Sequence, residues 1–476
     1  MNNILKQLLA LFAAFILTFS NIAPALAVNT LSDSESSSEQ YEDTTEEDSD
    51  KEKKKEKEEE KSAPRDGKPV LGNGETGILI DAISGRTLYE KDSDKKMYPA
   101  STTKIMTALL AVEAVERGEV SMDTQIQITA EMLAGLDPEG TSMALIEGEI
   151  LTLEELLRGL MIASGNDAAN AIATHLGKSV ASFVDIMNAR AEELGAHNTH
   201  FANPHGLFDE NHYTTAADMA KISHQAMKYF EFRNIVDIAH VKIPPTNKTE
   251  KERYYINTNG LLSVMRYTDF FYKNSIGIKT GYTSESGYCL VSAANRSGVE
   301  LIGVIFGGKS VSDSHGDSAE LLDWGFENYV SFTALQKNDM PCEIKVKQGK
   351  GTDSLTLSVP EPVTVIVPKE TKLEDLKIVP NVPDAVYAPV AANDKIGTVS
   401  VYLGDAEIGT GVLLANKAVE RSFFWPVLAL GEWLWSKLLV RIICYALIVT
   451  AVGFVLLFSV GMYRNIKRAN RRKTKG

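Results

Sequence analysis

The chain has little cysteine, and this scarcity excludes several kinds of site. Only three of its 476 residues are cysteines (Cys289, Cys342 and Cys444), and no C-x-x-C pair occurs. Zinc sites and disulfide frameworks need numerous or closely spaced cysteines. The sequence therefore predicts no structural metal and no disulfide framework, and we expect no cofactor.

Basic patches with interleaved aromatic residues are missing too, outside the C-terminal tail, and the net charge is −14. Nucleic-acid binding is therefore not expected. Residues 31–61 hold 14 acidic and 6 basic side chains and show no apolar periodicity. A segment of this composition cannot bury enough apolar surface to fold. We predict that residues 28–68 form a disordered acidic tether.

The N-terminus has the pattern of a secretory signal. Lys6 precedes an apolar run that ends in Ala25-Leu26-Ala27, a small-residue cleavage site. This order predicts a signal peptide over residues 1–27. An uncleaved N-terminal anchor is the alternative.

The C-terminus has the pattern of a membrane anchor. Residues 442–462 contain no charged side chain, and residues 464–476 contain seven Lys and Arg. Such a run can cross a bilayer, and the positive flank stays in the cytoplasm. We predict a transmembrane helix over 441–463 with a cytoplasmic tail, so that the bulk of the chain lies outside the cell. The preceding membrane-interface segment, residues 421–440, carries Trp425, Trp433 and Trp435. A buried core helix is the alternative for the apolar run.

Between these ends the pattern predicts two domains. Residues 77–91 read as a β-hairpin, an apolar helix follows Ser101, and Thr152 with Glu155 forms a capping box for a second helix. Strands at both ends with helices between them favour an α+β domain over residues 69–331, one sheet covered by helices. Residues 335–420 alternate apolar and polar side chains between turns, which predicts a small all-β sandwich.

One tetrad at the start of the first helix has the residues of a nucleophile and its base. Ser101 and Lys104 are three residues apart, so they share a helix face. A serine hydroxyl needs a proton acceptor, and a lysine can serve if burial or a neighbouring cation lowers its pKa. The tetrad Ser93–Lys96 has the same spacing but no helix after it, so we interpret it as a solvated loop.

Two further motifs supply the polar groups that such chemistry needs. Ser164-Gly165-Asn166 ends a strongly apolar helix, and Lys279-Thr280-Gly281 is expected at the start of a strand. The set S-x-x-K, S-D-N and K-T-G is the signature of penicillin-binding proteins and class A β-lactamases. The second motif of this chain is S-G-N and not S-D-N. The three motifs together are far more specific than any one of them.

With these motifs the chain resembles the low-molecular-mass penicillin-binding proteins, the serine-type D-alanyl-D-alanine carboxypeptidases. The segments "YPASTTKIMTALLAVE", "FANPHGLFDENHYTTAADMA" and "NTNGLL" are similar to blocks of that family, in its order. The resemblance implies a penicillin-binding, β-lactamase-like transpeptidase domain acting on peptidoglycan stem peptides and inhibited by β-lactam antibiotics. The acidic tether and the true membrane span depart from the family pattern.

The resemblance also implies roles for individual residues. Ser101 would be acylated, Lys104 would accept its proton, and Ser164 would relay a proton to the leaving D-alanine. Asn166 would bind the substrate amide, and Lys279 and Thr280 would bind the terminal carboxylate. The backbone N–H groups of Ser101 and Tyr282 would hold the oxyanion, and Gly281 would let the strand approach the substrate.

Nearby polar residues receive structural predictions. We expect His205 to be a loop histidine and Asp167 to brace its loop, whereas Glu139, Glu147 and Glu149 are predicted to be surface charges.

Three alternative functions remain at this stage. A β-lactamase would use the same acylation, but no E-x-x-L-N stands between Asn166 and Lys279. A D,D-endopeptidase would use the same site, and a non-catalytic wall-binding scaffold would keep only the fold.

Overall fold

The computed structural model describes residues 69, 71–138, 140–423, 430, 433 and 438–473. The predicted signal peptide and acidic tether, residues 1–68, lie outside this part of the chain. So do Glu139, and Trp425 and Trp435 of the predicted membrane-interface segment. The α+β fold class predicted from the sequence is confirmed, whereas the exact domain boundaries stay predictions.

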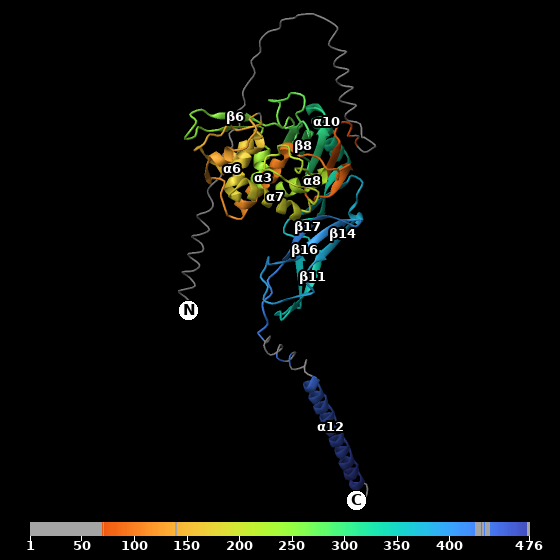
Figure 1. The fold of residues 1–476 in the computed structure, drawn as a ribbon. Helices are drawn as coiled ribbons and strands as arrows, with labels where there is room; N and C mark the ends of the chain where they lie inside the picture. The colour runs from red at the N-terminus through yellow and green to blue at the C-terminus, as the bar shows by residue number, and fades with distance from the viewer. Residues whose placement is uncertain are drawn as a thin grey trace, which may run out of the picture. The chain divides into compact units, whose positions relative to one another are not determined.

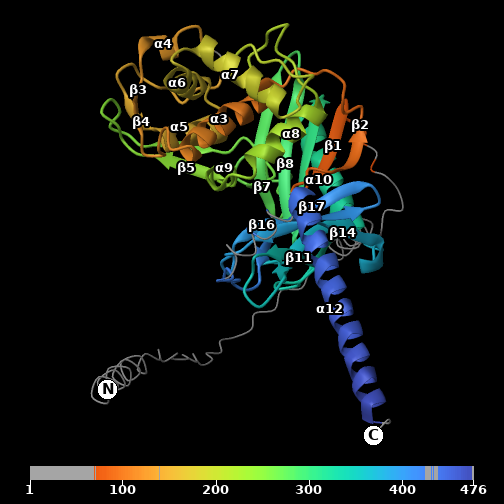
Figure 2. The same ribbon diagram turned by 90° about the horizontal axis from the view of Figure 1, so that it is seen from below.

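A five-stranded antiparallel sheet forms the centre of the first region, with the order β2-β1-β9-β8-β7 (Figure 2). Its strands are β1 (Thr76–Asp81), β2 (Thr87–Lys91), β7 (Ser275–Thr283), β8 (Gly287–Arg296) and β9 (Val299–Gly308). The predicted hairpin is therefore β1–β2. Because β7 stands at the edge of the sheet, one side of this strand has no neighbouring strand.

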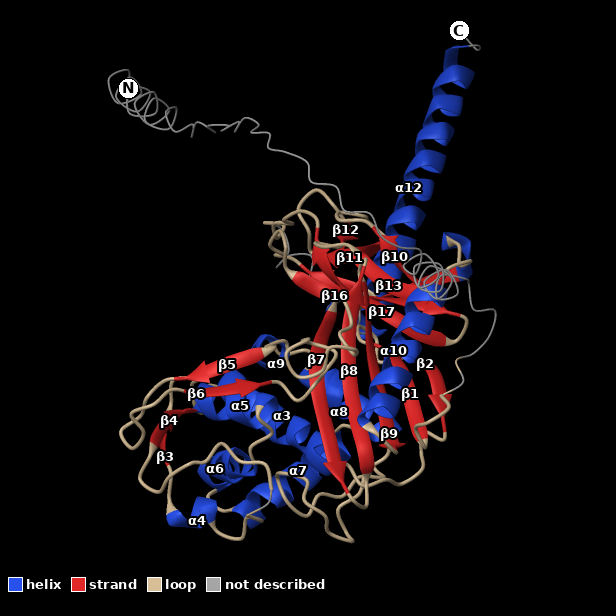
Figure 3. Cartoon of the chain, turned by 90° about the horizontal axis from the view of Figure 1, so that it is seen from above, coloured by secondary structure: helices blue, strands red, loops and turns tan. Residues whose placement is uncertain are grey.

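Helices cover both faces of this sheet (Figure 3). The helix α10 (Val311–Asn328) packs on one face, against β8 and β9, and α8 (Ala216–Ala226) packs on the other. Beyond α8 lies a helical region with two short antiparallel strand pairs, β3 (Gln125–Gln127) with β4 (Ile150–Thr152) and β5 (His240–Ile243) with β6 (Arg253–Ile256). Its helices are η1 (Ala100–Thr103), α3 (Lys104–Glu116), α4 (Ala130–Leu133), α5 (Leu153–Ile162), α6 (Asn166–Gly177), α7 (Val180–Glu193) and α9 (Phe230–Val236).

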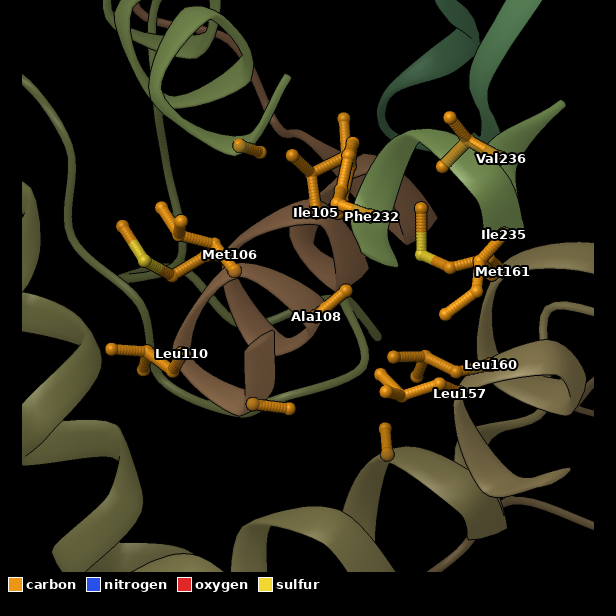
Figure 4. Close-up of a cluster of buried hydrophobic side chains, with 14 of the residues drawn as sticks. Ile105, Met106, Ala108, Leu110, Leu157, Leu160, Met161, Phe232, Ile235 and Val236 are labelled. Carbon is orange, nitrogen blue, oxygen red and sulfur yellow. The ribbon is translucent and has the colours of Figure 1, made fainter. Parts of the chain in front are cut away.

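The helix α3 is the centre of the helical region. The sequence predicts one apolar face for it, but the structure buries it on all sides, from Lys104 to Ala114. Figure 4 shows the reason: Ile105, Met106, Ala108 and Leu110 point in different directions. Side chains of α5 (Leu157, Leu160, Met161) and α9 (Phe232, Ile235, Val236) lie on one side of α3, and α6, α7 and α8 also contact it. A helix that is apolar all round must be enclosed by other elements, and this enclosure places Lys104 in the protein interior.

The second region is all-β, as predicted (Figure 1). A six-stranded sheet has the order β14-β16-β17-β12-β11-β15, and β10 pairs with β13. The strands are β10 (Tyr329–Leu335), β11 (Cys342–Lys347), β12 (Ser354–Ser358), β13 (Val363–Pro368), β14 (Leu376–Asn381), β15 (Ala385–Tyr387), β16 (Lys395–Leu403) and β17 (Ala406–Ala415), with the short helix η2 (Leu373–Asp375). Its core consists of aliphatic side chains such as Leu357, Val399 and Val401.

The last helix, α12 (Leu438–Lys473), contains an apolar stretch over Arg441–Asn465 with a mean hydropathy of 2.6. Within the described residues it is the one helix long and apolar enough to cross a membrane. Its length and composition are compatible with membrane anchoring.

Candidate active site

Ser101 and Lys104 meet at the junction of η1 and α3. The Lys104 Nζ lies 2.9 Å from Ser101 Oγ, and Lys104 is fully buried. Nζ also donates to Asn166 Oδ1 at 2.8 Å and to the carbonyl oxygen of His205 at 2.7 Å. A neutral amine has two hydrogens and one lone pair. The oxygens of Asn166 and His205 can only accept, so they use both hydrogens of the neutral amine. The lone pair of Lys104 Nζ is then available to accept the proton of the Ser101 hydroxyl.

The surroundings of Lys104 favour this neutral form. Burial lowers the pKa of Lys104 well below its usual value, because a charged ammonium loses its hydration there. The positive charge of Lys279 lowers it further, whereas the negative charge of Asp167 raises it. The pair therefore has the electrostatics of a nucleophile and its base.

Ser164, Gly165 and Asn166 form the turn between α5 and α6. Ser164 has a φ of +61°, in the left-handed region that side chains other than glycine rarely adopt. Ser164 and Asn166 line the same cavity as Ser101. The strained turn thus presents one hydroxyl and one amide beside the nucleophile.

The Lys279-Thr280-Gly281 motif stands on the edge strand β7. We predicted it at the start of a strand, which is wrong: β7 begins at Ser275, so the motif lies in its second half. The turn signal that marks the strand's beginning is Asn274, which has a φ of +72°, and the prediction overlooked it. Burial lowers the pKa of Lys279 to about 7, and the positive charge of Arg266 adds to the effect.

Gly281 allows β7 to approach the nucleophile closely. A Cβ at this position would lie 3.0 Å from both the Pro99 carbonyl oxygen and the Ser101 backbone nitrogen. These contacts are tighter than side chains normally make, so only glycine fits without a shift. The next residue, Tyr282, is exposed, and its ring contacts that of Tyr288 at a tilt of 32°, with the ring centroids 4.4 Å apart.

One cavity of about 830 Å³ brings these motifs together. Of the predicted site residues it is lined by Ser101, Ser164, Asn166, Thr280, Gly281 and Tyr282. Lys104 and Lys279 are buried, and each bonds a residue that lines it.

Two cavity residues were missed by the sequence reasoning. Thr258 Oγ1 accepts from Thr280 Oγ1 at 2.6 Å and lies 3.4 Å from Lys279 Nζ. Arg266 lines the cavity and brings a second positive charge near Lys279. The segment "NTNGLL", quoted above for its resemblance, contains Thr258, and this was the available signal. Arg266 stands in a loop without any motif.

Neighbouring polar residues have mainly structural contacts. The imidazole Nδ1 of His205 accepts from the backbone N–H of Leu207 at 3.2 Å, and burial lowers the pKa of His205 to about 3. This neutral ring agrees with the predicted loop role. The prediction for Glu149 is wrong, because Glu149 is fully buried and pairs with Arg253, whereas Glu147 is exposed.

The described part of the chain contains no candidate metal-binding site. No three His, Cys, Asp or Glu side chains gather there in a way that could hold a metal ion.

Comparison with known proteins agrees with this geometry. Residues 68–310 match the family model described as D-alanyl-D-alanine carboxypeptidase, and residues 329–421 match the C-terminal domain of penicillin-binding protein 5. The chain is 32% identical to the D-alanyl-D-alanine carboxypeptidase DacF of Bacillus subtilis, over 78% of this chain and 93% of that protein. It is 30% identical to DacA of Escherichia coli K12, over 74% and 86% of the two chains.

A solved structure is similar in both fold and sequence. Penicillin-binding protein 5 of Haemophilus influenzae superposes with a TM-score of 0.59 and is 30% identical, covering 75% of this chain and all of that one. The match extends over the catalytic and the all-β region together.

Proposed function

The chain belongs to the D-alanyl-D-alanine carboxypeptidase family, and we propose that it removes the terminal D-alanine from peptidoglycan stem peptides through an acyl-enzyme on Ser101. The observation that supports this most directly is the contact of Lys104 Nζ with Ser101 Oγ at 2.9 Å, with both N–H bonds of the neutral amine accepted elsewhere. The reaction then proceeds in two steps, each through this pair.

In the acylation step, Lys104 Nζ takes the proton of the Ser101 hydroxyl while Oγ forms a bond to the carbonyl carbon of the penultimate D-alanine. The carbonyl oxygen becomes an oxyanion, which the backbone N–H groups of Ser101 and Tyr282 stabilise. Removing one such donor typically costs about 3 kcal/mol of transition-state stabilisation. The bond to the terminal D-alanine nitrogen then breaks. Ser164 gives its proton to this leaving amine and takes the proton that Lys104 holds, so Lys104 is neutral again.

Residues of β7 and of the turn before α6 bind and orient the substrate. Lys279 and Thr280 bind the terminal carboxylate, and Asn166 bonds the substrate amide. With a pKa of about 7 in the empty site, Lys279 is partly charged near neutral pH. An arriving carboxylate favours its charged form, so binding takes up a proton.

In the second step Lys104 takes a proton from a water molecule whose oxygen attacks the acyl-ester. Lys104 then gives this proton to Ser101 Oγ as the bond to the shortened peptide breaks. A β-lactam enters through the same acylation, because its strained amide occupies the place of the D-alanyl-D-alanine peptide bond. Antibiotics of this class are therefore inhibitors that label Ser101 covalently.

The apolar helix α12 anchors the enzyme to the cell membrane. The seven Lys and Arg after the apolar run favour a cytoplasmic tail. The catalytic domain then lies on the outer side, where peptidoglycan is found.

The proposal is tested by incubating the full-length protein with penicillin and measuring its intact mass. We expect one adduct, mapped by peptide analysis to Ser101, and release of D-alanine from a D-alanyl-D-alanine peptide. A Ser101→Ala variant should show neither, while Ser93→Ala, in the second tetrad, should behave as wild type. An adduct on another residue, or rapid hydrolysis of nitrocefin without D-alanine release, would overturn the proposal.

A further inference from the structure

The carboxylate of Asp167, in the first turn of α6, holds a segment that is remote in sequence. Asp167 is buried, with 1% of its surface exposed. Oδ1 accepts from the backbone N–H groups of Met143 and Ala168, both at 2.9 Å. Oδ2 accepts from Ser142 Oγ at 2.6 Å and from the backbone N–H of Leu145 at 3.0 Å. Three of the four donors belong to residues 142–145, so one carboxylate fastens this segment to α6.

The same segment reaches the active site through Thr141. Thr141 Oγ1 donates to the carbonyl oxygen of Ser164 at 2.6 Å, and the Thr141 carbonyl accepts from the Asn166 backbone N–H at 2.8 Å. The strained turn is therefore bonded to Thr141 on both sides of Gly165. A non-glycine residue with positive φ costs about 1 kcal/mol or more and persists only when its surroundings hold it. The Thr141–Leu145 segment supplies part of that support.

On the side that faces β6, the Thr141–Leu145 segment is held by weaker hydrogen bonds. The Met143 carbonyl oxygen accepts from Tyr255 Oη at 2.8 Å and from Arg253 Nη1 at 3.3 Å. Both donors stand on β6. Hydrogen bonds to an ionised carboxylate are roughly twice as strong as those between neutral groups. Asp167 is therefore the principal tie of the segment.

We propose that Asp167 is a positioning residue: its carboxylate holds the Thr141–Leu145 segment against Ser164 and Asn166 and so sets where these two side chains meet the substrate. This inference rests on the proposed function, which assigns the roles of Ser164 and Asn166. Asn166 Oδ1 also accepts from Lys104 Nζ, so a displaced turn misaligns the base as well. A displacement of about 1 Å in such a site can cost about 100-fold in rate.

The negative charge of Asp167 also affects the pH dependence of acylation, which provides a second measurement of its role. It raises the pKa of Lys104, against burial and Lys279. The other titratable groups that face Lys104 are His205 and His212, whose pKa values burial lowers to about 3 and about 4. They stay neutral near pH 7. Loss of the Asp167 charge therefore lowers the pKa of Lys104 and moves the acid limb of the acylation rate to lower pH.

The test compares three variants of the full-length protein in detergent micelles, with fluorescent penicillin as the acylating probe across a range of pH. In Asp167→Asn the amide NH₂ faces backbone N–H groups whichever way it turns, so the segment is released. We expect about a 100-fold slower acylation and an acid limb at lower pH. Ser142→Ala removes one bond and keeps the charge, so we expect a loss of about tenfold or less with the acid limb unmoved. Tyr255→Phe, on β6, should stay within about threefold of wild type.

The outcomes separate this inference from the proposed function. Folded Asp167→Asn that is acylated at the wild-type rate would overturn the positioning role. If thermal melting shows that Asp167→Asn does not fold, Ser142→Ala decides, and a wild-type acylation rate in that variant rejects the role. Wild-type protein that forms no adduct on Ser101 would instead refute the proposed function.

Discussion

The two folded regions of this chain, residues 71–328 and 329–421, bury different kinds of side chain. The catalytic region encloses Lys104, Lys279, Asp167 and several other polar groups. In the described residues of the all-β region, Ser400 is the one buried polar side chain, and the core is otherwise aliphatic. Burying an ion costs several kcal/mol. A protein retains buried ions where its chemistry needs shifted pKa values. The buried lysines therefore indicate the functional region, and the aliphatic core indicates a structural one.

The sharpest way to break this comparison is to remove the buried base. Lys104→Met replaces the ammonium with an apolar side chain of similar length. We expect at least about a 1,000-fold slower acylation by penicillin, because the nucleophile loses its base. Thermal melting should show an unchanged or higher melting temperature, since replacing a buried ionisable group with an apolar one is often neutral or stabilising. Retained labelling by fluorescent penicillin would exclude Lys104 as the base.

A substitution in the core of the all-β region should have the opposite pattern: a loss of stability without a loss of acylation. Leu357, on β12, is fully buried. Leu357→Ala should lower the free energy of unfolding by about 3 kcal/mol, through lost burial and a residual cavity, while acylation of Ser101 keeps its rate. Denaturant unfolding and penicillin labelling measure the two effects. Leu373→Ala is the control, because this leucine is 54% exposed. A large loss of acylation in folded Leu357→Ala would mean that the two regions are functionally coupled.

A smaller effect is expected from a methyl group on the edge strand. Gly281→Ala places a Cβ 3.0 Å from the Ser101 backbone nitrogen, so β7 must shift away from the nucleophile. We expect acylation to slow by roughly 10- to 100-fold, measured with fluorescent penicillin. Gly316→Ala is the matched control: no atom lies within 4 Å of the added methyl on α10. Its activity should be that of wild type.

The mildest effect is a pH dependence that sharpens the role of Lys279. With a folded pKa of about 7, Lys279 loses its proton as the pH rises through that value, and the carboxylate of the substrate loses its charged partner. We expect kcat/KM for D-alanine release to fall about tenfold per pH unit above this limb. Lys279→Arg keeps its charge at high pH, so this limb should disappear even though the maximal rate is lower. An unchanged alkaline limb in Lys279→Arg would assign it to another group.

The comparison also separates what could be predicted from what could not. Local signals were sufficient for the β1–β2 hairpin, the capping box at Thr152 and Glu155, and the α+β class, because turn residues and periodicity act over a few neighbours. They failed for Glu149, whose partners Arg253 and Thr246 are about a hundred residues away. They also failed for Arg266, which stands in a loop without a motif. Its effect, a positive charge that lowers the pKa of Lys279, depends on the folded structure.

The sequence by itself determined which groups were available: a serine one helical turn before a lysine, a second serine with an amide, and a lysine on a strand, between apolar runs near the two ends of the chain. Only the tertiary structure decided their ionisation and spacing. Burial lowers the pKa values of both lysines, and the positive charge of Lys279 lowers that of Lys104 further, as Arg266 does for Lys279. A single carboxylate that accepts four hydrogen bonds holds the turn in place. These are effects of distance and dielectric, which depend on how the chain is folded and not on the order of its residues.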